Sequence, residues 1–233
     1  MHIFYTPDIE KLSQLPEEES QHCVKVLRLT EGERIRLTDG KGNFYDAEIT
    51  YAHPKKCEVK IVEKIEQKKQ WDFVIKMAVA PTKNMDRIEW FAEKATEIGM
   101  DAFTCLKCRY SERKEVKPIR LEKILISAMK QSLKARIPEL QGMTPFKEVV
   151  TAPFEGRKFI AYCSEVHPKR LIKDLYKKGE NVLILIGPEG DFSDEEVQLA
   201  LANGFEPISL GESRLRTETA ALAALQTVHV LNQ

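Results

Sequence analysis

The sequence lacks both a long hydrophobic run and an excess of charge of either sign. Its most apolar run, VLILI at residues 182–186, is far shorter than the about 20 apolar residues that a membrane-spanning helix needs. The N-terminus has no basic stretch followed by an apolar core, so we expect no secretory signal, no membrane association and a cytoplasmic protein. Basic and acidic residues number 36 each, so any electrostatic function has to be local.

Cysteine and histidine are sparse, with five of each, and they do not stand at metal-binding spacings. Cys105 and Cys108 form a C-x-x-C, but no second cysteine pair or histidine pair accompanies them at zinc spacing. A buried strand end is the favoured interpretation of this pair, with zinc as the minor alternative. The odd number of cysteines favours reduced thiols. We therefore predict that the protein holds no metal.

Three common motifs are also missing from the sequence. It has no G-x-G-x-x-G after a strand and no G-x-x-x-x-G-K-[ST], which disfavours dehydrogenases with the usual dinucleotide site and P-loop NTPases. It has no G-x-S-x-G elbow to carry a serine nucleophile. Acyl transfer, like metal-assisted hydrolysis, is therefore disfavoured.

The 233 residues, 42% of them hydrophobic, are sufficient for one or two domains. A charged stretch at residues 64–70 predicts a boundary near Gln70, between a domain at 1–70 and another at 71–233. Before the boundary, alternating apolar residues predict strands at 34–39, 44–51 and 57–65, with one helix after Pro16. The N-terminal domain is therefore expected to be small and rich in β-structure.

After Trp71 the pattern alternates between strands and helices. Five apolar strands that alternate with helices predict an α/β domain whose mostly parallel sheet is covered on both faces. Residues 137–157 carry three prolines and are too rich in turns for a full helix. The expected strands are residues 73–79, 102–106, 159–163, 182–186 and 207–210, and the expected helices are 86–98, 121–133, 171–176, 194–202 and 219–231.

Two loops stand where ligands bind in open α/β sheets, after the carboxyl ends of strands. The first, GPEGDF at residues 187–192, is followed by Ser193 and Glu196, which are spaced as a capping box that opens a helix. Its glycines allow a backbone to approach a ligand closely, although a tight strand-to-helix turn explains them equally well. The second loop crowds Arg214, Arg216 and Glu218 before an alanine-rich helix. If these charged side chains are removed from water, they need partners. The partner is either a ligand or the opposite charge within a structural Arg–Glu cluster.

A basic segment lies at residues 107–136, which hold ten basic and three acidic residues. Such a patch on a neutral protein suits a phosphate backbone, and Tyr110 within it could stack on a base. A solvated helix face is an equally good interpretation.

With these features in view, the chain resembles the bacterial ribosomal RNA small-subunit methyltransferase E family. The resemblance covers most of the chain in blocks that stand in the family's order. In the family a second glycine is usual where this chain has Asp191. The blocks are HCVKVLRLTEGERIRLTDGKGNFYDAEI, KNMDRIEWFAEKATEIGM, AMKQSLKARIPEL, LIGPEGDFSDEE and SLGESRLRTETAALAAL.

The resemblance implies a methyltransferase of the SPOUT superfamily that uses S-adenosyl-L-methionine to methylate N3 of a uridine in 16S ribosomal RNA. Residues 1–70 would be a PUA-like RNA-binding β-barrel. Residues 71–233 would be a SPOUT α/β domain with a trefoil knot, and the enzyme would be a homodimer. Its partner would be ribosomal RNA of the small subunit or the assembled subunit.

The resemblance implies residues for cofactor and RNA contact, while the catalytic roles follow from the chemistry of uracil and from the crowding of charges on the second loop. We expect Arg216 to hold a uracil oxygen, with Glu218 or Glu189 as proton acceptor or as the partner that orients Arg216, and Arg214 as a further source of positive charge. RNA contacts are expected at Arg28, Lys130, Gln131 and Arg136. Cofactor contacts are expected at Cys163, Leu185, Gly187, Pro188, Gly190, Ser209, Leu210, Gly211 and Leu215.

Three alternatives stay open at this point. A non-catalytic RNA-binding factor for ribosome assembly would use the same barrel and basic patch. A SPOUT methyltransferase could act on another RNA or another position. A nucleotide-binding α/β oxidoreductase is disfavoured because the glycine fingerprint is missing.

Overall fold

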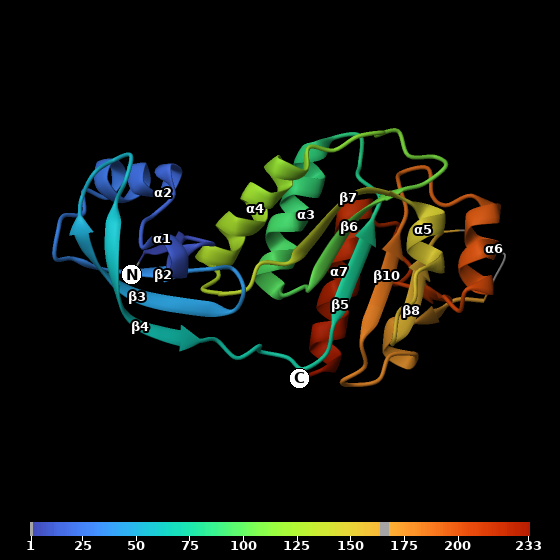
Figure 1. Cartoon of the computed structure of the whole chain (residues 1–233). Helices are drawn as coiled ribbons and strands as arrows, with labels where there is room; N and C mark the ends of the chain where they lie inside the picture. Colours follow the sequence, from blue (N-terminus) through green and yellow to red (C-terminus); the bar gives the residue numbers. More distant parts are fainter. Residues whose placement is uncertain (1, 164–167) are drawn as a thin grey trace. The chain divides into compact units, whose positions relative to one another are not determined.

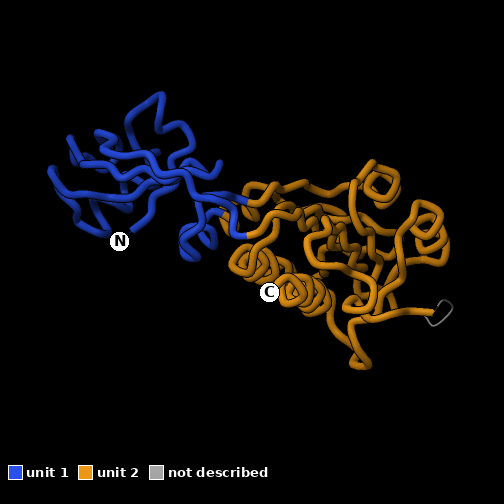
Figure 2. The backbone as a smooth tube through the Cα atoms, turned by 90° about the horizontal axis from the view of Figure 1, so that it is seen from below, with its two compact units in different colours: residues 1–70, 126–137 blue, residues 71–125, 138–233 orange. Residues whose placement is uncertain are grey.

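The computed structural model describes residues 2–163 and 168–233, and the chain forms two compact units (Figure 2). Unit 1 comprises residues 1–70 together with 126–137, and unit 2 comprises residues 71–125 and 138–233. The segment 126–137 thus belongs to unit 1 although it follows the expected boundary near Gln70. No helix in the described part of the chain is both long and apolar enough to cross a bilayer.

Unit 1 is built on a four-stranded sheet in the order β1-β2-β3-β4. The pair β1–β2 is parallel and the other two pairs are antiparallel. Two short helices, α1 (Ile9–Leu12) and α2 (Glu17–Gln21), precede β2, and α2 continues into a π-helical turn, His22–Val26. The strands are β1 (Ile3–Tyr5), β2 (Arg34–Thr38), β3 (Asn43–Tyr51) and β4 (Glu58–Glu66).

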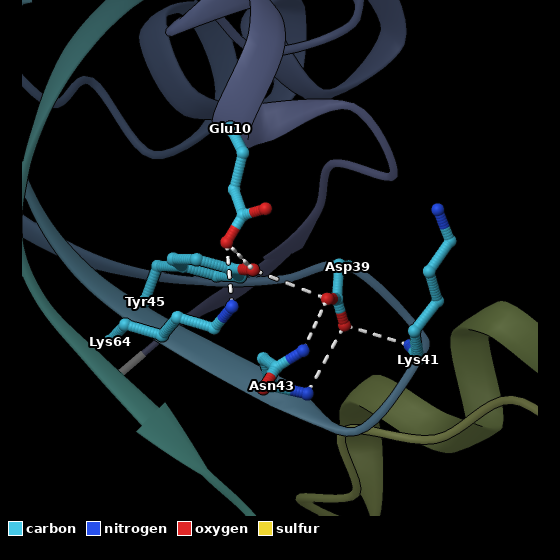
Figure 3. A network of polar contacts seen from close by, with 6 residues as sticks. All are labelled: Glu10, Asp39, Lys41, Asn43, Tyr45 and Lys64. Carbon is cyan, nitrogen blue, oxygen red and sulfur yellow. Dashed lines mark hydrogen bonds and ion pairs between the residues drawn. The ribbon is translucent and has the colours of Figure 1, made fainter.

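A polar network fixes the turn between β2 and β3 (Figure 3). The Asp39 carboxylate accepts hydrogen bonds from the backbone N–H groups of Lys41 at 2.7 Å and Asn43 at 3.1 Å, and from the Asn43 amide at 2.7 Å. The Tyr45 hydroxyl lies 3.1 Å from Glu10 Oε1 and 3.2 Å from Asp39 Oδ2. Burial alone would raise the pKa of Asp39, but the hydrogen bonds that its carboxylate accepts lower it below its usual value. Burial and the bond to Glu10 raise the pKa of Tyr45 to about 12.

Unit 2 holds a seven-stranded sheet in the order β7-β6-β5-β10-β8-β11-β9. All six strand pairs are parallel, which confirms the predicted parallel sheet. The central strand β10 (Val182–Ile186) is buried along its whole length. The others are β5 (Ile75–Val79), β6 (Ala102–Lys107), β7 (Glu139–Pro145), β8 (Arg157–Ala161), β9 (Arg170–Leu171) and β11 (Glu206–Ser209).

Helices cover both faces of this sheet (Figure 1). Leu183 and Leu185 of β10 share an apolar core with residues of α5 (Phe146–Thr151) and α6 (Asp194–Ala202). Alternate residues of β10 point to the other face because a strand has a period of two. There α7 (Thr217–Leu231) packs against β5, β10 and α3 (Met85–Ile98). One further helix, α4 (Pro118–Gln131), follows β6.

One sequence expectation was wrong in this unit, and two elements were not predicted. Residues 171–176 do not form a helix but continue from β9 into a single 3-10 turn, Ile172–Asp174, because Leu171 pairs with Ser209 of β11. The proline-rich interval at 137–157 holds a strand, β7, and a short helix, α5. Neither was predicted from the sequence, because prolines are typical of turns. Pro145 is tolerated because it ends an edge strand and stands immediately before the first turn of α5.

The Asp39 network predicts acid-sensitive stability of the chain. Because the pKa of Asp39 is lowered on folding, its ionised form stabilises the fold above about pH 4, and this contribution is lost as pH falls through the folded-state pKa. We expect Asp39→Asn to reduce the free energy of unfolding by about 1–3 kcal/mol at pH 7 and by much less at pH 3, as measured by urea unfolding followed by circular dichroism.

The matched control is Asp8→Asn, because Asp8 is exposed in the same unit and its side chain makes no capping hydrogen bond. This control should change stability by less than about 0.5 kcal/mol at either pH. A cost of Asp39→Asn that is equal at pH 7 and pH 3 would contradict the interpretation.

Candidate functional site

The carboxyl ends of the central strands bring the candidate loops together in unit 2. The N–H of Ala80, at the end of β5, donates to the carbonyl of Ile186, at the end of β10, at 2.9 Å. Beyond this bond, Glu189 Oε1 accepts the backbone N–H of Lys83 at 3.0 Å. The loop after β10 is thereby tied to the loop after β5. Glu189 is exposed, and this contact gives it a structural role in the turn.

The two glycines of the first loop lie in close packing. A Cβ at Gly187 would lie 3.1 Å from the Phe192 ring, and a Cβ at Gly190 would lie 3.1 Å from Tyr110 Cβ. The Leu185 side chain, before the loop, lies in the apolar core, and Pro188 is buried within the loop. The predicted capping box is confirmed, because Ser193 and Glu196 bond reciprocally at the start of α6.

Asp191 connects this loop to the end of β8. One carboxylate oxygen accepts the N–H of Cys163 at 2.8 Å, and the other accepts the N–H of Phe192 at 2.9 Å. Its φ of 64° is in the left-handed region that glycine favours, which agrees with the glycine usual at this position. The side chain therefore provides a link between loops that glycine could not make. Cys163 is exposed beside it.

The second candidate loop follows β11 and contains an open glycine. Gly211 has a φ of 112°, and no atom lies within 4 Å of the position that a Cβ would take. Ser209 Oγ accepts the N–H of Gly211 at 3.2 Å, which closes the turn. The buried Thr217 begins α7, and its hydroxyl donates to the carbonyl of Gly187 at 3.1 Å. This bond holds the second loop against the first.

The structural Arg–Glu cluster that was the alternative for Arg214, Arg216 and Glu218 does not form among the described residues. Glu218 is buried, and its Oε1 lies 3.9 Å from Nε of Arg87 on α3, while its Oε2 has no hydrogen-bond partner in the described residues. Arg214 and Arg216 are exposed, and the described part of the chain offers neither of them an ion pair. Arg87 was missed from the sequence because only the packing of α3 against α7 brings it near Glu218.

Arginines of the basic segment after β6 form hydrogen bonds with residues near the candidate loops. The Arg109 N–H donates to Glu196 at 2.9 Å and its guanidinium donates to Glu195 at 3.1 Å. The Arg113 guanidinium donates to the carbonyls of Thr82 and Lys83. These arginines are therefore engaged within the protein.

Cys105 and Cys108 are buried at the end of β6, as the favoured interpretation predicted. Burial raises the pKa of Cys105 to about 12 and also raises that of Cys108. Within the described residues, no group of three or more His, Cys, Asp or Glu side chains is placed to hold a metal ion.

The residues expected to bind RNA lie in unit 1. Lys130 is largely buried and forms an ion pair with Glu19 at 2.5 Å, so its charge is already compensated. Gln131 and Arg136 are exposed, and Arg28 is exposed on a backbone with φ of 57°. Of the predicted cations, Arg28 and Arg136 are exposed and have no ion pair among the residues that the structure describes.

Comparisons with known proteins agree with this architecture. A family model described as an RNA methyltransferase domain matches residues 69–229, and one described as an RNA methyltransferase PUA domain matches residues 15–62. Ribosomal RNA small subunit methyltransferase E of Bacillus subtilis is 28% identical over 91% of this chain and 87% of its own.

Solved structures resemble the whole chain. The crystal structure of a probable rRNA-methyltransferase from Porphyromonas gingivalis has 48% identity and a TM-score of 0.95, covering 100% of this chain and 98% of its own. The structure of a putative methyltransferase from Legionella pneumophila with bound cofactor SAM has 30% identity and a TM-score of 0.88, covering 99% and 97%. Ribosomal RNA small subunit methyltransferase E from Neisseria gonorrhoeae, bound to S-adenosyl methionine, has 28% identity and a TM-score of 0.87, covering 99% and 98%.

The bond between Thr217 and Gly187 predicts a measurable stability cost. Thr217→Val removes the hydroxyl and leaves a buried carbonyl without its donor, so we expect a loss of about 1–2 kcal/mol in the free energy of unfolding. Thr219→Val is the matched control, since Thr219 is exposed two residues along the same helix and should cost less than about 0.5 kcal/mol. Equal effects of both changes in urea unfolding would refute the role of the bond.

Proposed function

The chain belongs to the family of RNA methyltransferases that carry an RNA methyltransferase PUA domain, and on this premise we propose that it methylates N3 of a uridine in 16S ribosomal RNA with S-adenosyl-L-methionine as donor. The observation that carries the proposal is the likeness, over 99% of the chain, to methyltransferase structures with this cofactor bound. The names of the curated relatives support ribosomal RNA of the small subunit as the substrate.

The proposal includes an architecture. Residues 71–233 form a SPOUT α/β domain with a trefoil knot, and residues 1–70 form a PUA-like RNA-binding domain. Two copies associate as a homodimer, and the protein acts in the cytoplasm on naked ribosomal RNA or on the assembled subunit.

The loops after β10 and β11 have properties that suit binding of the cofactor. The packing of Gly187 and Gly190 brings the backbone close to neighbouring loops, and the open space at Gly211 leaves room for a ligand beside the backbone. Backbone groups here would bind the adenine and the ribose. The residues in contact would be Cys163, Leu185, Gly187, Pro188, Gly190, Ser209, Leu210, Gly211 and Leu215.

The chemistry requires removal of a proton from the uracil. N3 is protonated at neutral pH, so the site has to stabilise the negative charge that spreads onto O2 and O4 as this proton leaves. The guanidinium of Arg216, which is exposed and has no ion pair among the described residues, supplies that stabilisation, with Arg214 two residues before it. The bound cofactor supplies an electrophilic methyl group on a sulfonium, whose transfer requires in-line alignment.

Two carboxylates are candidates for receiving the proton. Glu218 is the stronger candidate, because it is buried at the start of α7 with one carboxylate oxygen that lacks a hydrogen-bond partner among the described residues. Its neighbour Arg87 would hold the carboxylate in position. Glu189 is the weaker candidate for proton acceptor, because its Oε1 already accepts a hydrogen bond from the N–H of Lys83.

The role of Arg216 predicts a loss of turnover. We expect Arg216→Ala to lower kcat by about 10²–10³-fold, which is the cost of removing one group that stabilises a developing oxyanion. Transfer of tritium from labelled S-adenosylmethionine to 16S ribosomal RNA measures it. Arg120→Ala is the control, since Arg120 is paired with Glu89 on α3 and should keep the wild-type rate within about twofold. An Arg216→Ala variant at the wild-type rate would remove Arg216 from the mechanism.

The homodimer predicts a molecular mass of twice that of the chain in solution. The chain has a mass of 26.7 kDa, so light scattering at micromolar concentration should give about twice this value. A stable monomer at that concentration would contradict this part of the proposal.

A further inference from the structure

The turn between β2 and β3 in unit 1 has a fixed backbone. Asp39 accepts hydrogen bonds from the N–H groups of Lys41 and Asn43 across the turn (Figure 3). Gly40 and Gly42 have φ values of 73° and 114°, which side-chain-bearing residues rarely adopt. The position from which the Lys41 side chain leaves the turn is therefore determined by the fold.

The segment 133–137 is bound to this turn. The Gly42 N–H donates to the Ala135 carbonyl at 2.8 Å, and the Ile137 N–H donates to the Gly40 carbonyl at 2.9 Å. The Gln67 side-chain amide also donates to the Leu133 carbonyl at 3.0 Å and accepts the Ala135 N–H at 2.6 Å, while the Gln67 N–H donates to the Gly42 carbonyl at 2.9 Å. The segment is thus held both by the turn and by the side chain of Gln67.

This arrangement brings two cations together. Lys41 and Arg136 are paired across an antiparallel bridge, and the Arg136 guanidinium lies over Gly42, 2.4 Å from where a Cβ would stand. Both side chains are exposed, and no acidic side chain forms an ion pair with either of them in the described part of the chain. Their backbones are anchored, so binding an anion here would cost little ordering of the main chain.

The neighbouring groups favour binding by these two side chains. The turn amides of Gly40, Lys41 and Gly42 are already bonded within the protein, so they are not free to bind an anion. The Asp39 carboxylate is directed at the N–H groups of the turn, and Figure 3 shows the Lys41 ammonium extending away from it. Glu10 is bonded to Tyr45 and Lys64, and Glu66 is exposed on β4 opposite Asn43.

We propose that Lys41 and Arg136 form a preorganised site for one phosphodiester of the RNA substrate, separate from the loops where the methyl group is transferred. The identification of the anion as RNA rests on the proposed function and on the match of residues 15–62 to an RNA methyltransferase PUA domain. Such a contact fixes the position of the RNA without reading its sequence. Lys41 was not among the residues expected to bind RNA from the sequence.

The dependence of RNA affinity on salt tests this site. For the full-length protein and a fluorescein-labelled 16S ribosomal RNA transcript, the slope of log K against log[KCl] counts the phosphates that are neutralised. We expect Lys41→Ala and Arg136→Ala each to reduce the magnitude of the slope by about 0.7–1 and to weaken binding about three- to tenfold at low salt. Arg136→Lys should restore the slope because it retains the charge.

Lys56→Ala is the matched control, since Lys56 is an exposed lysine of the same unit whose ammonium is paired with Glu58 at 2.6 Å. It should leave the slope unchanged. Affinity for S-adenosylmethionine should stay within about twofold of wild type in every variant, because none of these side chains lies in the transfer loops, and the kcat of Lys56→Ala should likewise stay within about twofold of wild type.

Two failures can be told apart. If wild type binds and methylates the RNA but both alanine variants keep its salt slope, the phosphate site is wrong and the methyltransferase proposal stands. If wild type transfers no methyl group to any RNA while both variants reduce the slope, the phosphate site stands and the proposed reaction is wrong.

Discussion

The central strand β10 is the constraint on which the catalytic unit depends. All five of its residues are buried, and it pairs in parallel with β5 on one side and β8 on the other. Ile186 stands opposite both Val79 and Ala161, so the three strands end at the same level. Parallel strands that end at the same level place the loops that follow them at the same edge of the sheet. The register therefore determines which loops lie close together.

The loops are then locked by contacts that mostly involve the backbone. The side chains of Glu189 and Asp191 accept hydrogen bonds from the main-chain N–H groups of Lys83 and Cys163. The Thr217 hydroxyl donates to the main-chain carbonyl of Gly187. Fixed backbone dipoles need no reorganisation when charge develops, which suits a reaction that depends on alignment more than on covalent chemistry by the protein. Arg216 is exposed and has no ion pair among the described residues, which is why it is the side chain that we propose for the chemistry.

The sequence predicted what depends on local patterns. The apolar run of β10 and the capping box of α6 were both found correctly, because each is encoded within a few neighbouring residues. The strand β7 was missed because Pro138 before it and Pro145 at its end are typical of turns, and Pro145 is tolerated because the strand lies at the sheet edge. The pairing of Glu218 with Arg87, and of Lys41 with Arg136, joins residues that are far apart in the chain and follows only from tertiary packing.

The most direct test of the account is to map the methyl group. The purified protein would be incubated with tritiated S-adenosylmethionine and, separately, with naked 16S ribosomal RNA and with small subunits from a strain that lacks this activity. The account predicts label at N3 of a single uridine, and the better substrate would identify the stage of assembly at which the enzyme acts. Absence of label from both substrates, or label on another atom of the RNA, would contradict it.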